Sequence, residues 1–260
     1  MPGPGLLLLA LLGVDGDPLP AGMVRIAGGV HPRPCLEGSC EEVHSVSTID
    51  RSLSADAFGR SLWVDAFDID RTEVTVAAYA GCVAAGYCAR PGRGAQCNAD
   101  KRGKADHPVN CVNWAQAQSY CAWTGKRLPR WIEWDRAAFG ADPRRIQPWG
   151  EAEPSCARAV FRARTELVEN LKKGCGGLGG TQVAGSRDGG ASPEGAVDLV
   201  GNVSEWLFDW RPSESEPRRE RLHAGGDWAS GPDALGRIRG APPTSTRAQL
   251  GFRCVQSSSF

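Results

Sequence analysis

The side chains best able to do chemistry in this chain are ten cysteines and four histidines. The histidines (31, 44, 107 and 223) are scattered and no Cys-x-x-Cys pair occurs, so the spacing does not favour a zinc site. Cys111 and His107 lie four residues apart across a proline, which is weak support for a nucleophilic pair. An even number of cysteines in a glycine-rich chain instead favours five disulfides, and with them an oxidising compartment.

Local spacing suggests how most of the cysteines pair. Cys82 lies in the last turn of a predicted helix that ends at Gly86, so a bridge to Cys88 would staple that helix end. Three further pairs would each close a loop: Cys35 with Cys40, Cys97 with Cys111, and Cys156 with Cys175. Each such cross-link contributes about 2–3 kcal/mol, in the chain-entropy account through the unfolded state. Spacing alone leaves the connectivity open.

Capping residues and apolar spacing predict helices over residues 75–86, 113–124 and 130–139. Asn113 and Gln116 have the spacing of a capping box, and a glycine follows each helix at position 86, 125 or 140. Arg127 and Glu133, in and beside the last two of these helices, are expected to form structural pairs rather than to act in catalysis. Core positions are expected for five tryptophans: Trp114, Trp123, Trp134, Trp149 and Trp206.

The composition fits one globular domain. The 260 residues carry 30 basic and 30 acidic side chains, so nothing favours nucleic acid or an anionic membrane as partner. Glycine (33) and proline (18) are frequent, which predicts many turns and long irregular connections. No apolar run is long enough to span a membrane; residues 6–13, LLLLALLG, predict a signal-type segment over residues 1–22, followed by one domain over 23–260.

Seven segments of the chain carry motif-like residue patterns. The longest reads Val112-Asn-Trp-x-x-Ala-x-x-Tyr-Cys-x-Trp-x-Gly-Lys-Arg-Leu-Pro-x-x-x-Glu-Trp134. The others are Met23–Gly29, Phe67–Val74, Gln147–Gly150, Asp198–Trp206, Gly225–Trp228 and Gly251–Cys254. In this order the segments resemble the signature of the formylglycine-generating enzyme family, the sulfatase-modifying factors. The resemblance implies the family's variant of the C-type-lectin-like fold, an α+β domain with little regular secondary structure. It also implies a bridge between Cys121 and Cys254.

The oxidases of this family convert a sulfatase cysteine into formylglycine with O₂, and two cysteines in Gly-Gly-Ser-x-x-Cys-x-x-x-x-Cys hold Cu(I) as thiolates. The matching region, Gly225–Arg239, contains no cysteine, and none occurs between Cys175 and Cys254. Asp227 also replaces the serine of the motif. Without soft ligands we expect no copper. Asp227, Trp228, Arg237 and Arg239 are placed by the resemblance in the substrate groove.

The resemblance further implies a structural calcium ion at the Asp198–Trp206 element. Carried over residue by residue, the ligands are the side chains of Asp198 and Glu205 and the carbonyls of Gly201 and Val203. All are oxygen donors, as a hard cation requires. The alternative is a plain turn in which the two acids are solvated or paired with arginine. A second family calcium site lacks its asparagine here.

Two functional classes stay open. The first is an extracytoplasmic binding or sensory module (periplasmic, secreted or envelope-associated) that keeps the fold and groove without oxidase chemistry, for a protein or small-molecule ligand. The second is a divergent enzyme of the same family, which oxidises a protein cysteine or another substrate with a different metal centre. The missing cysteines favour the first.

Overall fold

The computed structural model describes residues 19–31, 62–142, 144–162, 175, 180–211 and 220–257. The expected bridge between Cys35 and Cys40, and residues 1–18 of the expected signal-type segment, lie outside these residues.

The three predicted helices are confirmed as α2 (Val76–Ala84), α3 (Trp114–Trp123) and α4 (Trp131–Phe139). The Thr75 side chain caps α2 by accepting from the Ala78 amide, and Asn113 and Gln116 form the expected capping box at α3. At α4 the Glu133 carboxylate accepts the Arg130 amide at 2.7 Å. A glycine with a positive φ follows each helix, at positions 86, 125 and 140. Glycine adopts this conformation readily because it has no β-carbon.

Within the described residues the strands form three sheets. One is antiparallel, in the order β1 (Met23–Ile26), β4 (Phe67–Asp70), β9 (Val255–Ser257). The second pairs β2 (Gly29–His31) with β3 (Leu62–Val64). The third has the order β7 (Ile238–Ala241), β6 (Glu220–Ala224), β5 (Ser204–Arg211), β8 (Leu250–Gly251), with β5 and β8 parallel.

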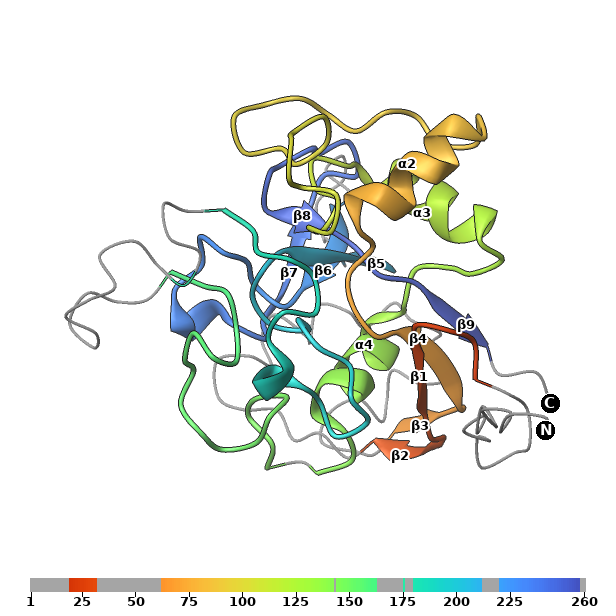
Figure 1. Cartoon of the computed structure of the whole chain (residues 1–260). Coiled ribbons are helices and arrows are strands. Elements are labelled where there is room, and N and C mark those ends of the chain that lie inside the picture. Colours follow the sequence, from red (N-terminus) through yellow and green to blue (C-terminus); the bar gives the residue numbers. More distant parts are fainter. Residues whose placement is uncertain are drawn as a thin grey trace, which may run out of the picture.

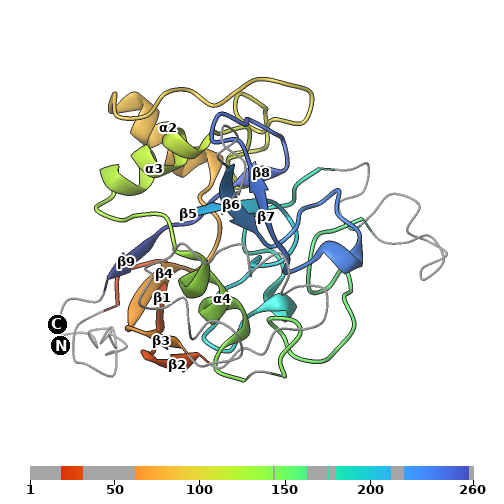
Figure 2. The same cartoon turned by 180° about the vertical axis from the view of Figure 1, so that it is seen from behind.

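Helix α4 lies between the sheet of β1, β4 and β9 and the sheet centred on β5, whereas α2 and α3 lie together at the far end of β5 and β8 (Figures 1 and 2). The position of α4 between the two sheets places its Trp134 and Phe139 in one buried cluster with Ile69 of β4 and Leu207 of β5. A second cluster packs α2 and α3 on Trp206 and Phe252. The mixed α+β class with few helices is confirmed.

Four predicted disulfides form: Cys82–Cys88, Cys97–Cys111, Cys156–Cys175 and Cys121–Cys254. The last joins α3 to the residue before β9, as the resemblance implied. No helix in the described ranges is both long and apolar enough to cross a membrane.

One expected core position is wrong. Trp134 and Trp206 are fully buried and Trp114 and Trp149 half-buried, but Trp123 is 38% exposed. It ends α3, where its ring contacts Tyr120 and lies close to Gly81 of α2, and the described residues leave the rest of it exposed. Arg127 and Glu133 pair as expected, with two hydrogen bonds of 2.6 and 2.7 Å.

Candidate functional site

The turn before β5 brings the expected calcium ligands into the interior. Gly201 has φ +85°, and a β-carbon there would lie 2.6 Å from the Val160 carbonyl oxygen, so only glycine fits. Asp198 also has a positive φ, of 57°, and its side chain is buried. Its Oδ2 accepts the Gly185 amide at 2.6 Å, which fixes the carboxylate within the fold.

Glu205 is already engaged by the protein. Arg253 donates to its two carboxylate oxygens at 2.7 to 2.9 Å, and Trp134 donates to Oε2 at 2.8 Å. The side chains of Glu205 and Arg253 are completely excluded from solvent. Burial raises the pKa of Glu205, and the Arg253 charge opposes that rise.

A third buried carboxylate, Glu73, was missed by sequence reasoning. It lies in the Phe67–Val74 segment of the resemblance, to which no ligand role was assigned. Burial first, then the charges of Asp198 and Glu205, raise its pKa well above the ordinary value. Glu73 Oε1 and Asp198 Oδ1 are buried without a hydrogen-bond partner among the described residues. Burial likewise raises the pKa of Asp198.

The buried carboxylates of Glu73, Asp198 and Glu205 meet some, but not all, of the requirements of a cation site. If all three were ionised they would outnumber the one fully buried guanidinium among them, that of Arg253, although the charges of Arg187 and Arg71 also lower the pKa of Asp198. An excess of buried negative charge is stabilised by protons or by cations. In the described part of the chain, however, no three His, Cys, Asp or Glu side chains converge as a metal-binding group. A calcium ion here would need backbone carbonyls beside Asp198, and would compete with Arg253 for Glu205.

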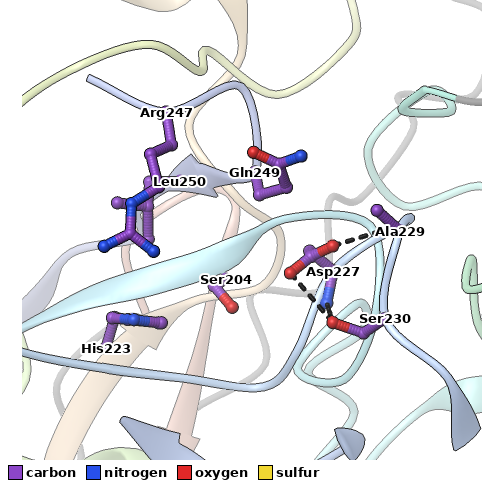
Figure 3. Close-up of a pocket in the computed structure, with 8 residues that line it drawn as sticks. All are labelled: Ser204, His223, Asp227, Ala229, Ser230, Arg247, Gln249 and Leu250. Carbon is purple, nitrogen blue, oxygen red and sulfur yellow. Dashed lines mark hydrogen bonds between the residues drawn. The ribbon is translucent and has the colours of Figure 1, made fainter. Parts of the chain in front are cut away.

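A pocket of about 350 Å³ opens on the other side of the start of β5 (Figure 3). It is bounded by the start of β5, by β6, by the turn after β6 and by the segment that leads into β8. Its lining consists of Ser204, His223, Asp227, Ala229, Ser230, Arg247, Gln249 and Leu250.

The turn over residues 227–230 forms one wall of this pocket. The Asp227 carboxylate accepts the Ala229 amide at 2.8 Å and the Ser230 hydroxyl at 2.9 Å. Upstream, a β-carbon at Gly225, where φ is +98°, would lie 2.5 Å from the Leu199 carbonyl oxygen. The turn is therefore fixed both at its base and by its own side chains.

His223 on β6 lines the pocket and is 6% exposed. Its ring meets Trp206 edge to face at 6.0 Å, and Nδ1 has no partner among the described residues. Burial, and then the charges of Arg247 and Arg239, lower the pKa of His223 to about 3. The imidazole is therefore neutral at neutral pH.

The four expected groove residues are only partly brought together. Asp227 lines the pocket, and Trp228 beside it donates to the Ala248 carbonyl at 3.5 Å. Arg239 on β7 lies opposite His223 on β6 in the antiparallel register. Arg237 is exposed and donates to the Asp233 carbonyl. Seven lining residues were missed: Ser204, His223, Ala229, Ser230, Arg247, Gln249 and Leu250.

A family model for the sulfatase-modifying factor enzyme 1-like domain matches residues 18–258. The chain belongs to the sulfatase-modifying factor family.

Relatives within this family include both active and inactive enzymes by name. The chain is 29% identical over 164 residues to inactive C-alpha-formylglycine-generating enzyme 2 of Bos taurus (60% of this chain, 52% of the relative). It is 30% identical over 179 residues to formylglycine-generating enzyme of Streptomyces coelicolor (61% and 55%). The chain thus spans about half the length of the curated relatives it matches.

Solved structures share the fold at lower identity. CarF superposes with a TM-score of 0.66 at 19% identity, covering 91% of this chain and 98% of CarF. PvdO from Pseudomonas aeruginosa superposes with a TM-score of 0.60 at 22% identity, covering 91% and 94%. The fold is therefore that of the sulfatase-modifying factor family over most of the chain.

The spacing of the family's copper motif falls on defined positions of this structure. Counted from Gly225-Gly226, its first cysteine corresponds to Ser230 and its second to Leu235. The Ser230 hydroxyl donates to Asp227, while Leu235 is buried in the apolar core. A hydroxyl and an isobutyl group supply no thiolate for Cu(I).

Proposed function

We propose that this sulfatase-modifying-factor domain has no copper oxidase activity and acts as an extracytoplasmic binding module, with its ligand in the pocket of Figure 3. The observation that carries the proposal is the replacement of both motif cysteines, by Ser230 and Leu235, in a turn that remains folded around Asp227. The Bos taurus relative is named inactive C-alpha-formylglycine-generating enzyme 2, which supports a family branch without the oxidation step.

The extracytoplasmic part of the proposal rests on the disulfides. All four bridges among the described residues join cysteines within bonding distance, and no described cysteine is free. Stable disulfides of this number persist in oxidising compartments and are rare in the reducing cytosol.

We further propose that the interior around Asp198 takes a structural calcium ion. Two observations support a cation there. Asp198 and Glu73 each have one buried oxygen without a hydrogen-bond partner among the described residues. The three buried carboxyl groups of Glu73, Asp198 and Glu205 also outnumber the fully buried guanidinium of Arg253. Asp198 would hold it with backbone carbonyls of Gly201 and Val203. Glu205 would join only if Arg253 shared its carboxylate, because Arg253 now occupies both oxygens. Such an ion would neutralise buried charge and fix the turn before β5.

Titration with Cu(I) against a competing chelator tests the absence of copper chemistry. We expect no stoichiometric site in the native chain, and no formylglycine in a cysteine-containing sulfatase peptide incubated with the protein, Cu(I), a reductant and O₂. A tight site, O₂ consumption with the peptide, or another transition metal bound after purification would support the divergent enzyme instead.

A double variant, Ser230→Cys with Leu235→Cys, provides the positive control. It restores both motif thiols in the same scaffold, and we expect it to bind one Cu(I) per chain. The single variant Ser230→Cys offers one thiolate and should bind Cu(I) much more weakly. If the double variant binds Cu(I) no better than the native chain, the assignment of these two positions is wrong.

A further inference from the structure

The pocket carries opposite charges on opposite walls. Figure 3 shows the Arg247 side chain and His223 on one side, and the Asp227 carboxylate with Ser230 on the other. The backbone carbonyl of Arg247 accepts the amides of Cys111 and Leu250, whereas its exposed guanidinium makes no hydrogen bond or ion pair with another described side chain. Its five N–H donors are therefore open to a ligand as far as the described residues are concerned. With His223 neutral, the pocket presents one cation and one anion.

The anionic wall is held in place before any ligand arrives. Each Asp227 oxygen accepts one hydrogen bond, Oδ1 from the Ala229 amide and Oδ2 from the Ser230 hydroxyl. A carboxylate has about four acceptor positions, so both oxygens can accept further donors from a ligand. Because these contacts already fix the rotamer, little conformational entropy is lost when the carboxylate binds.

Between the walls the pocket is lined by both polar and apolar groups, some of them buried and others partly exposed. Ser204 at the start of β5 is 3% exposed, and Gln249 contributes an amide. The Nδ1 atom of His223 is buried without a hydrogen-bond partner among the described residues. Leu250 adds one apolar surface.

We propose that this pocket binds a small zwitterion of the α-amino-acid class, with its carboxylate on Arg247 and its ammonium group on Asp227. The inference rests on the proposed binding role of the pocket and names its ligand class. A volume of about 350 Å³ is at the small end for ligand pockets, which typically measure about 300–1,000 Å³. A polyanion such as phosphate would meet Arg247 but be repelled by Asp227. An uncharged peptide segment would leave both charges without a partner.

The test is a binding screen on the full chain. Each common L-amino acid is added at millimolar concentration, thermal midpoints are recorded, and hits are measured by calorimetry. We expect at least one amino acid to raise the midpoint. Its C-terminal amide and its N-acetyl derivative, each lacking one charge, should bind about tenfold more weakly or worse, because each loses a charge-assisted contact.

Variants assign the binding to the two walls. We expect Arg247→Gln and Asp227→Asn each to weaken binding about tenfold or more, whereas Arg93→Gln, which alters an 80% exposed side chain outside the pocket, should leave it unchanged. Asn at 227 keeps an acceptor for the Ala229 amide, and near-ultraviolet circular dichroism checks that the variant folds.

Three outcomes would overturn the inference: no amino acid binds, a singly charged derivative binds as tightly as the zwitterion, or either pocket variant binds as tightly as the native chain. None of these results alters the Cu(I) titration. A negative screen with a negative copper titration therefore removes the ligand class and leaves the loss of oxidase chemistry in place.

Discussion

Arg253 and Glu205 form an ion pair that is sealed from solvent, with 2.7 Å between Nη2 of Arg253 and Oε1 of Glu205 and no exposed area on either side chain. Arg253 also donates to the carbonyls of Asp70, Arg71 and Val197. The Arg253 guanidinium therefore connects the end of β4 and the turn before β5 to the segment between β8 and β9. Neither partner can be removed without leaving the other charge buried.

We expect Arg253→Met to lower the free energy of unfolding by about 3–5 kcal/mol, because Glu205 then loses its compensating charge. Urea unfolding followed by tryptophan fluorescence measures the loss. Arg93→Gln breaks an exposed ion pair with Asp100 and should cost about 1 kcal/mol or less. Equal effects of the two variants would show that the buried pair contributes no more than a surface one.

Calcium should stabilise the folded chain. At a free calcium concentration about a hundred times the dissociation constant, the gain is about 2.7 kcal/mol, or about 5–10 °C in the thermal midpoint of a domain this size. We expect EDTA to remove this increment, Asp198→Ala to abolish it, and Asp198→Asn to keep part of it because the amide oxygen remains a ligand.

The exposed Asp188 supplies the matched control, since Asp188→Asn removes a carboxylate that only pairs with Arg71 at the surface. Its calcium response should equal that of the native chain. A midpoint that calcium and EDTA leave unchanged in the native protein would refute the calcium site.

His223 should make the fold sensitive to acid. Its pKa is lowered from 6.5 in an unfolded chain to about 3, first by burial and then by the charges of Arg247 and Arg239. As pH falls below 6.5 the unfolded chain takes up a proton that the folded chain refuses, so stability present above 6.5 is lost toward pH 3. The loss of unfolding free energy between about pH 7 and 5 should be smaller in His223→Gln. Parallel pH profiles would contradict the neutral buried imidazole.

The two disulfides at α2 and α3 should differ in their contribution. Cys121–Cys254 closes a separation of 133 residues and Cys82–Cys88 one of six. In the chain-entropy model the long bridge contributes about 5 kcal/mol and the short one about 2 kcal/mol. Paired Cys→Ala variants of each bridge, compared by urea unfolding, should reproduce that order; a larger loss for Cys82–Cys88 would contradict it.

Local features were predictable because their causes are local. Thr75 and Asn113 each accept an amide within the next three residues, so a helix start is encoded in a four-residue window. Cys82 and Cys88 are likewise brought together by one helix end. The pairing of Cys121 with Cys254 spans most of the domain, and only the family resemblance suggested it.

The sheets and the pocket were not predictable from periodicity. Strand β8 has two residues, and β5 is buried at five of its eight positions, so neither shows the alternation of a half-buried strand. His223 and Arg247 belong to no motif, and only the β5–β6 pairing and the loop into β8 bring them to one cavity. Asp227 was found because it stands where the family motif has another residue.

The segment from Arg247 to Ser257 completes several separate parts of the domain. It lines the pocket, carries Arg253 and Cys254, and adds β9 to the edge of β4. A nascent chain that has reached residue 240 therefore still holds Glu205 without its counter-charge, Cys121 as a thiol and β4 with an open edge. These contacts can form only after residues 247–257 have been synthesised, so the partly made chain exposes surface that the finished fold covers.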